Sequence, residues 1–430
     1  MLDEMLKILL SIPRPLLPAD TGGKIRSLQI FSRLAKRAEI HAISQADPEL
    51  DADSIEEMRR MFASYTPVYW KENPGNSPSF YIDVAKNQLS PLPYFIAKFC
   101  RPQFVRALRA LAGSRRFDLV LSDFLQTATP ALDLPIRPRV IFQHNVEYLL
   151  RQRKWQTETM PLKKWIFEAE WKKTQRIEAH VCRSFDHVIA VSEEDRRTFE
   201  QEFGVQHVST IPTGVDGEYF CPQAIPPKSA RLVFVGSMDW YPNEDGVTWF
   251  LREVYPRIRT AVPAASLTIV GRRPSSRLKA VAIDQPGVTL TGRVTDVRPY
   301  LAEAEVVVVP LRVGGGTRIK IPEAMAMGKA VVSTRIGAEG LPFHDGREIM
   351  LQDDPEKFAR DVITLLRDAS RRAAIASAAR KRVVRDHDWE SVVNCMEEIL
   401  GRVCVSFGAN AARLRRPGSQ RLGNCDLDDR

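Results

Sequence analysis

The sequence predicts an α/β protein with two parallel β-sheets, each covered by helices on both faces. Short runs rich in Val, Ile and Leu alternate with longer segments of helical periodicity. These runs are continuously apolar, which is typical of parallel strands buried on both faces. The alternation starts afresh after residue 229, so the 430 residues are expected to form two doubly wound domains rather than one large sheet.

The strands are expected where β-branched runs end at turn residues. In the first half they lie at 7–13, 39–44, 117–123, 139–145, 187–192 and 208–213. In the second half they lie at 231–237, 266–271, 287–292, 305–311, 330–334 and 348–352. The segments between them are long enough for the crossover helices that parallel strands require.

The domain boundaries follow from the same pattern. We expect an N-terminal Rossmann-like domain at 1–216 and a second one at 230–387. The segment 217–229 is proline-rich and aperiodic, which indicates a linker. A further helix is expected at 388–402, and a flexible tail at 403–430.

Composition limits the class of protein and its partners. Apolar residues make up 44% and charged residues 27%, and no apolar run reaches the length of a membrane span. The net charge of +9 allows an anionic partner such as nucleotide phosphate or acidic lipid, but the Lys and Arg residues are dispersed and match no nucleic-acid module. The N-terminus makes a poor signal peptide, and the six cysteines form no C-x-x-C pair. A cytoplasmic protein with reduced thiols and no nucleic-acid partner is therefore expected.

The most informative segment follows the strand expected at 305–311. It reads Gly314, Gly315, Gly316, Thr317 and Arg318. Glycines allow the backbone to approach a ligand closely, and Arg318 and Lys320 supply positive charge beside them. A mobile turn with two solvated cations is the alternative. The position after a strand and before a helix favours a diphosphate site.

A helix is expected to begin near Pro322 and to stop at Gly328. Proline is tolerated only in the first helical turn, and glycine is common just past a helix end. Glu323 then lies in the first turn, where its carboxylate can accept hydrogen bonds from a ribose diol or simply complement the helix dipole.

The N-terminal half offers fewer signals. Gly22 and Gly23 open the helix that follows the first strand, and Arg26 lies one turn further on. They form either an acceptor or phosphate loop or an ordinary helix start. His144 lies at the end of the strand at 139–145 and serves as a polar active-site group or as a structural histidine. Ser192 and Asp195 have the spacing of a helix capping box, which we prefer to an acid/base pair.

Two D-x-D strings resemble a metal-binding pair but lack its setting. Asp51 and Asp53 precede Ser54 and Glu57, which have the spacing of another capping box in a polar helix, and Asp386 and Asp388 fall between two late helices. Neither follows a buried strand, so no catalytic metal and no cofactor are expected.

The segment 232–341 resembles glycosyltransferases of the GT-B fold, specifically the retaining family 4 group. The resemblance rests on LVFVGSMDWYPNEDGVTWFL, LTIVGRRP and VTLTGRVTDVRPYLAEAEVVVVPLRVGGGTRIKIPEAMAMGKAVVSTRIGAEGL. The N-terminal half matches more loosely through GGKIR, HNVE, VSEED and IPTGVD. Bacterial sugar transferases of exopolysaccharide assembly are the most similar group.

The resemblance implies two Rossmann-like domains facing across a cleft, with helix 388–402 returning to the N-terminal domain. Glu323 is similar to the second acid of the family's E-x7-E motif, but Gly315 stands where the first acid belongs. The loop that begins at Gly236 also lacks the Arg and Lys with which many members bind the diphosphate. Arg318 and Lys320 are expected to replace them, with Arg272 or Arg273 as weaker candidates.

The resemblance further implies transfer of a sugar from a nucleotide-sugar donor to a glycan or lipid-linked acceptor, with retention, in exopolysaccharide or cell-envelope synthesis. His144 then contacts the donor phosphate or the reacting sugar. The departures at Gly315 and Gly236 leave a catalytically silent scaffold or regulatory subunit as the alternative.

The sequence also suggests peripheral binding to the inner face of the plasma membrane. Segment 97–116 is basic, and Phe104, Leu108 and Leu111 recur in it at helical spacing. A second basic stretch, 163–173, contains two tryptophans. An ordinary helix whose apolar stripe faces the core is the alternative for 97–116.

Overall fold

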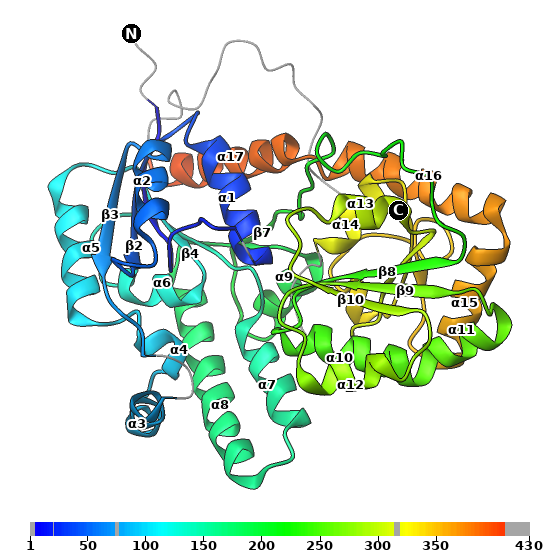
Figure 1. Cartoon of the computed structure of the whole chain (residues 1–430). Coiled ribbons are helices and arrows are strands. Elements are labelled where there is room, and N and C mark those ends of the chain that lie inside the picture. The colour runs from blue at the N-terminus through cyan, green and yellow to red at the C-terminus, as the bar shows by residue number, and fades with distance from the viewer. Residues whose placement is uncertain (1–4, 20, 74–76, 314–318, 409–430) are drawn as a thin grey trace. The chain divides into compact units, whose positions relative to one another are not determined.

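The computed structural model describes residues 5–19, 21–73, 77–313 and 319–408 (Figure 1). By its internal contacts the chain divides into two compact units. Unit 1 comprises the residues up to Pro212 and those from Glu390 on, and unit 2 comprises Thr213–Trp389. The chain therefore passes between the units at Pro212–Thr213, ahead of the proline-rich segment 217–229, and again at Trp389–Glu390.

Unit 1 contains a parallel sheet of seven strands in the order β3-β2-β1-β4-β5-β6-β7. Its strands are β1 (Lys7–Ser11), β2 (Glu39–Ala46), β3 (Ser64–Tyr69), β4 (Leu119–Asp123), β5 (Arg139–Phe142), β6 (His187–Ala190) and β7 (Val208–Thr210). The order reverses between β1 and β4, where Ile8 pairs with Leu119 and Leu10 with Leu121. This reversal is the switch point at which doubly wound sheets bind ligands.

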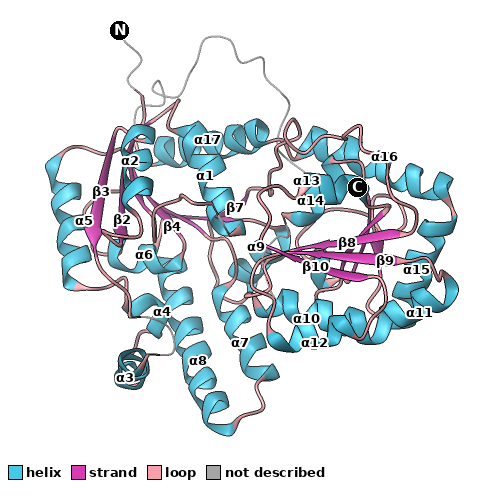
Figure 2. Ribbon diagram, viewed as in Figure 1, coloured by secondary structure: helices cyan, strands magenta, loops and turns pink. Residues whose placement is uncertain are grey.

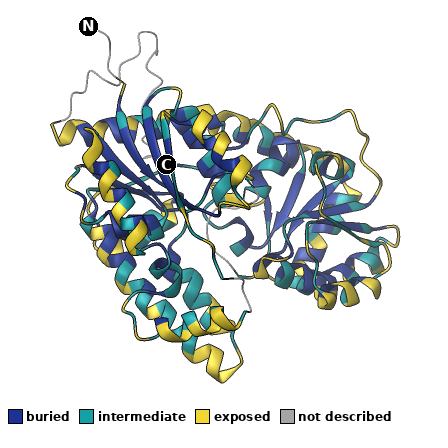
Figure 3. Ribbon diagram, turned by 60° about the vertical axis from the view of Figure 1, so that its left-hand side comes forward, coloured by how far each residue is buried: buried dark blue, intermediate teal, exposed yellow. Residues whose placement is uncertain are grey.

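Helices flank this sheet (Figure 2). They are α1 (Gly22–Leu34), α2 (Ala52–Met61), α3 (Pro78–Asn87), α4 (Tyr94–Ala97), α5 (Pro102–Ser114), α6 (Leu125–Ala131), α7 (Glu147–Thr157), α8 (Pro161–Ser184), α9 (Glu193–Gln201) and α17 (Trp389–Ser406). The inner strands β1, β4 and β5 are almost wholly buried, as their apolar sequences require (Figure 3). Ion pairs join α1 and the turn that follows it to α17: Arg33 contacts Glu390 at 3.2 Å, and Arg37, just after α1, contacts Glu397 at 2.9 Å.

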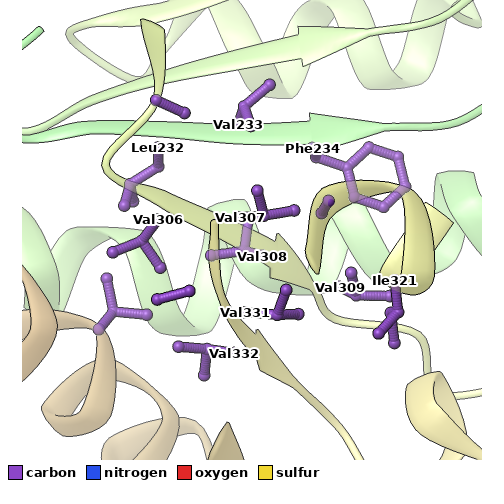
Figure 4. Close-up of a cluster of buried hydrophobic side chains, with 14 of the residues drawn as sticks. Leu232, Val233, Phe234, Val306, Val307, Val308, Val309, Ile321, Val331 and Val332 are labelled. Atoms are coloured by element: carbon purple, nitrogen blue, oxygen red, sulfur yellow. The ribbon is translucent and has the colours of Figure 1, made fainter. Parts of the chain in front are cut away.

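Unit 2 contains a parallel sheet of six strands in the order β10-β9-β8-β11-β12-β13. Its strands are β8 (Arg231–Val235), β9 (Ser266–Val270), β10 (Val288–Gly292), β11 (Val306–Val309), β12 (Ala330–Ser333) and β13 (Met350–Leu351). The buried side chains of β8, β11 and β12 form the centre of its core, with Ile321 packed beside them (Figure 4). Here the order reverses between β8 and β11, where Val306 pairs with Leu232.

The helices of unit 2 connect these strands. They are α10 (Tyr241–Trp249), α11 (Tyr255–Ala261), α12 (Ser276–Ile283), α13 (Arg298–Glu303), α14 (Lys320–Ala326), α15 (Pro355–Arg367) and α16 (Ala369–Asp386), with a π-helical turn at Phe250–Val254 and a 3-10 turn at Ile336–Ala338. The two sheets and their helices confirm the predicted doubly wound α/β architecture.

One strand was not predicted, and one predicted surface is not exposed. Strand β3 contains Pro67 and lies at the edge of its sheet, where proline is tolerated. The apolar stripe of α5 faces the core: Phe104 and Leu108 are fully buried, and Leu111 packs against the same cluster. The idea that this stripe lies in a membrane is therefore wrong, and the alternative of a core-facing helix holds. No described helix is long and apolar enough to cross a bilayer.

Candidate functional site

Polar side chains gather at the switch point of unit 1, beyond the carboxyl ends of β4 and β5. Asp123 ends β4, and its Oδ1 lies 2.6 Å from Nε2 of His144, which follows β5. Ser27 of α1 donates a hydrogen bond of 2.7 Å to the other Asp123 oxygen. Nη1 of Arg26, also on α1, lies 3.3 Å from His144 Nδ1. Three sequence segments thus meet in one buried cluster.

One protonation state satisfies both contacts of His144. A guanidinium can only donate, so His144 Nδ1 accepts from Arg26 and Nε2 carries the proton given to Asp123. Burial lowers the pKa of His144, although the charge of Asp123 opposes this shift. The imidazole is consequently neutral, buried and engaged at both nitrogens. In this arrangement it positions Arg26 and has no nitrogen left to act as a base.

An aromatic ring packs against the face of the His144 imidazole. Phe124 stacks on the imidazole, with ring centroids 3.9 Å apart and planes 12° apart. A Cβ on Gly23 would lie 2.7 Å from this phenylalanine ring, so only glycine fits there without displacing it. Helix α1 begins at Gly22 as expected, and the hydroxyl of Thr21 accepts from the Lys24 N–H. Gly23 therefore supports the position of His144 through Phe124.

Arg26 is a buried cation at this edge of the sheet. Burial lowers its pKa to about 10, while the charges of Asp195 and Asp123 oppose the shift. It stays protonated at neutral pH. Ser192 caps α9 by accepting from the Asp195 N–H, which confirms the predicted capping pair. The carboxylate of Asp195 also acts on Arg26, a role that its capping position did not reveal.

A buried acid holds the segment that carries His144. The carboxylate of Glu178 on α8 accepts hydrogen bonds of 2.8 Å from the backbone N–H groups of Glu147 and Tyr148 at the start of α7. Burial, with the charge of Glu147, raises the pKa of Glu178 to about 8, and these two hydrogen bonds limit the shift. The contact fixes where α7 begins, directly after the loop containing His144.

Unit 2 has its own polar cluster beyond β8 and β11. Lys320 starts α14, and its Nζ donates to Oδ1 of Asn243 at 2.8 Å while lying 4.4 Å from the centre of the Phe234 ring. Nδ2 of Asn243 in turn donates to the carbonyl of Ser237 at 2.8 Å. A Cβ on Gly236 would lie 2.7 Å from Lys320 Nζ and 2.8 Å from Asn243 Nδ2. Glycine at 236 is thus needed for the lysine to reach this position.

Glu323 lies in the first turn of α14. Burial raises its pKa to about 7, and the charge of Lys320 opposes the shift. The helix ends as predicted, with Gly328 at a φ of 69° and the Lys329 N–H bonded to the Ala324 carbonyl at 3.0 Å, as in a Schellman motif. Helix α14 begins at Lys320, two residues before Pro322. Five of the predicted site residues lie outside the described residues: Gly314, Gly315, Gly316, Thr317 and Arg318.

Further positive charge lies at the same edge of this sheet. Nε of Arg272, just after β9, donates to Oγ of Ser237 at 2.9 Å and lies 3.2 Å from Asp239. Arg273 lies 3.6 Å from the same carboxylate and is largely exposed. Both weaker candidates therefore approach the loop after β8, where Asp239 partly neutralises them.

The described residues contain no group of three His, Cys, Asp or Glu side chains arranged to hold a metal ion. The capping box expected from Ser54 to Glu57 is wrong, because α2 begins at Ala52 and Ser54 lies inside it. Asp51 does not cap this helix with its side chain either. Its carboxylate accepts from the Asp47 N–H at 2.8 Å and makes no hydrogen bond to its own helix, although it occupies the cap position of α2.

Comparison with known families decides what these two clusters belong to. A model described as "Glycosyltransferase Family 4" matches residues 28–219, and one described as "Glycosyl transferases group 1" matches residues 229–368. The chain belongs to the glycosyltransferases, with a Family 4 region followed by a group 1 region. The prediction of a hexosyltransferase that uses a nucleotide sugar is thereby confirmed.

Solved structures share the fold of this glycosyltransferase. Sucrose-phosphate synthase from Thermosynechococcus elongatus superposes with a TM-score of 0.69 at 17% identity, covering 93% of this chain and 100% of that one. Anabaena HepE in complex with UDP and glucose gives a TM-score of 0.66 at 15% identity, covering 92% and 100%.

Curated relatives also match by sequence. An uncharacterized 44.6 kDa protein in the cps region of Klebsiella pneumoniae is 23% identical over 385 residues, which are 87% of this chain and 95% of that protein. A phosphatidyl-myo-inositol mannosyltransferase of Mycolicibacterium smegmatis is 30% identical over 238 residues. That match spans 52% of this chain and 60% of the mannosyltransferase.

Sequence reasoning missed several members of the two clusters. Asp123 and Ser27 bond to each other and to His144, and Asn243 bonds to Lys320. Asp123 is an acid at the carboxyl end of a buried strand of the glycosyltransferase, and this signal was available. Nothing local distinguishes Ser27 or Asn243, which gain their roles through contacts with distant residues.

Proposed function

We propose that the enzyme transfers a hexose from a nucleoside-diphosphate sugar to a glycan or lipid-linked acceptor, with retention of anomeric configuration. The observation that carries this proposal is the cluster of Lys320, Asn243 and Gly236 at the switch point of unit 2. It presents a cation beside a backbone without a side chain, which suits a diphosphate.

Glu323 is proposed to bind the donor ribose. It follows Lys320 by less than one helical turn, so the two side chains can reach neighbouring parts of one nucleotide. A pKa raised to about 7 means that a substantial fraction of the carboxyl is protonated near neutral pH. Hydrogen bonds from a ribose diol stabilise the ionised form, so ionisation of Glu323 and binding of the donor favour each other.

Unit 1 is proposed to supply the acceptor side of the reaction. Arg26 remains charged and is held by neutral His144, so the pair offers a fixed positive group to a phosphate or to the oxygens of a sugar. Because both nitrogens of His144 are occupied, we assign it a positioning and electrostatic role. This agrees with a retaining reaction, in which the leaving phosphate takes the acceptor proton and the protein stabilises charge.

The proposed pathway is exopolysaccharide or cell-envelope glycan assembly on the cytoplasmic face of the plasma membrane, with the enzyme bound peripherally. Support comes from the Klebsiella relative in a cps region and from the phosphatidyl-myo-inositol mannosyltransferase of Mycolicibacterium smegmatis. HepE, crystallised with UDP and glucose, makes a UDP-sugar the first donor to try.

The experiment is a thermal-shift screen of UDP-, GDP- and ADP-sugars, followed by donor hydrolysis without acceptor. A donor at 100 times its Kd should stabilise the enzyme by about 2.7 kcal/mol. Glu323→Ala should remove most of this shift while the unliganded Tm stays close to that of wild type. Absence of both binding and hydrolysis with every donor would overturn the proposal and favour the silent-scaffold alternative.

A further inference from the structure

The hairpin made by α7 and α8 carries exposed apolar side chains where its two helices join. We call residues 154–165 the hairpin tip. Within it Met160 is 53% exposed, Leu162 71% and Trp165 58%. Residues 161–165 are all exposed, and the tip projects from the sheet of unit 1 (Figure 3). Large apolar side chains grouped in this way mark an interaction site more often than chance exposure does.

The rest of the hairpin does not need these side chains. The C-terminal half of α8 packs into the core of unit 1 through Ala179, Val181 and Cys182. Between the helices, Trp155 and Trp171 lie with ring centroids 5.8 Å apart, and Lys154 Nζ lies 4.5 Å from the centre of the Phe167 ring. These contacts hold the helices together, so the outward residues are not explained by packing.

Positive charge surrounds the exposed apolar residues. The segment 151–164 contains one acid and five basic residues. Arg151 is paired with Glu147 at 3.5 Å, and the other four basic residues are Arg153, Lys154, Lys163 and Lys164. The acid, Glu158, accepts hydrogen bonds from the backbone N–H groups of Thr159 and Met160 and so shapes the turn. An apolar centre with a basic rim fits an anionic partner.

We propose that the hairpin tip binds anionic bilayers, with Leu162 and Trp165 in the headgroup region and Lys163 and Lys164 against the lipid phosphates. Tryptophan and lysine are the side chains that favour this interface. A second copy of the chain is a poorer occupant, because two such basic tips repel each other. The inference deepens the peripheral location proposed above and rests on it, but it does not depend on the assignment of the donor site.

The test is co-sedimentation of the full chain with vesicles of phosphatidylcholine, with and without phosphatidylglycerol. Wild type should bind the anionic vesicles only, and added salt should weaken binding. Replacing Lys163 and Lys164 by Gln should weaken it roughly 25-fold, since each lysine near the surface contributes about fivefold. Leu162→Ser with Trp165→Ser should weaken it at least tenfold.

Matched controls lie in unit 2. Ile283 is 83% exposed on α12, and Arg277 and Lys279 are exposed on the same helix. Ile283→Ser, and the pair Arg277→Gln with Lys279→Gln, should leave vesicle binding unchanged. Trp165→Phe keeps an apolar ring, so it should still bind while losing most of the tryptophan quenching caused by brominated lipids.

Each outcome is decisive for the tip. Equal loss in the tip and control variants, or unchanged binding in the tip variants, would overturn the proposal. The proposal would also be overturned if the tip variants abolished self-association in the absence of lipid but left vesicle binding unchanged. Donor hydrolysis distinguishes the two proposals. Vesicle binding without hydrolysis would support the tip assignment and contradict the proposed activity.

Discussion

Lys320 offers the sharpest test of the donor site. Its Nζ donates to Asn243 and lies over the Phe234 ring, beside the backbone of Gly236. We expect Lys320→Met to keep the aliphatic packing while removing the charge. Two opposite charges about 4 Å apart attract by about 4 kcal/mol at an intermediate dielectric.

The net effect should be smaller than this attraction. In the free enzyme Lys320 already interacts with Asn243 and the Phe234 ring, and it gives up part of these contacts on binding a diphosphate. We therefore expect a loss of about 2–3 kcal/mol, or roughly 30- to 150-fold, in kcat/KM for donor hydrolysis. The unfolding free energy should fall by only about 1 kcal/mol, for the lost hydrogen bond to Asn243.

Lys329 is the matched control. It precedes β12 at the amino end of the strand, and its Nζ donates to the carbonyls of Ala302 and Ala304 at 2.7 and 3.0 Å. Lys329→Met should cost about 1–3 kcal/mol of unfolding free energy and leave donor kinetics unchanged. Steady-state kinetics and urea denaturation measure both quantities. Normal donor turnover in Lys320→Met, or equal kinetic losses in both variants, would refute the reasoning.

Three further predictions concern the supporting residues. Asp123→Asn should lower the unfolding free energy in urea by about 1–3 kcal/mol, because His144 loses a charged acceptor; an unchanged midpoint would argue against the buried cluster. Gly236→Ala should reduce the donor-induced thermal shift, since the new methyl group collides with Lys320 and Asn243; an undiminished shift would count against this placement. Between pH 4.5 and about 8 folded Glu178 keeps a proton that the unfolded chain loses, so unfolding free energy should fall as pH rises, by up to about 1.4 kcal/mol per pH unit. Glu178→Gln should flatten this fall in urea titrations, and an equally steep pH dependence in that variant would contradict the raised pKa.

The sequence contained enough information for the architecture, because strands buried on both faces leave a strong local signal. It also located local hydrogen-bond motifs, such as the cap at Ser192 and the glycine stop at Gly328. It failed for β3, whose Pro67 argues against a strand unless its place at a sheet edge is known. It also left the α5 stripe ambiguous, because an apolar stripe has the same period whether it faces a core or a lipid.

The site was only partly predictable for a related physical reason. His144, Arg26, Lys320 and Glu323 were chosen from their positions after strands or near helix starts, and the structure places them at the two switch points. Their partners are distant in the chain: Asp123 lies 21 residues from His144, and Asn243 lies 77 residues from Lys320. Such pairings depend on strand order, which a single sequence does not encode locally.

The two clusters share one physical principle. In each, a cation is ordered by the fold before any ligand binds: Arg26 by His144 and by the charges of Asp123 and Asp195, Lys320 by Asn243 and Phe234. A long basic side chain loses rotamer freedom when it engages an anion, and here folding has already imposed much of that loss. The electrostatic gain on binding is thereby preserved, and the two cationic side chains need little reorganisation as charge develops on a leaving phosphate. Substitutions of the holding residues should consequently weaken anion binding even though they leave each cation in the sequence.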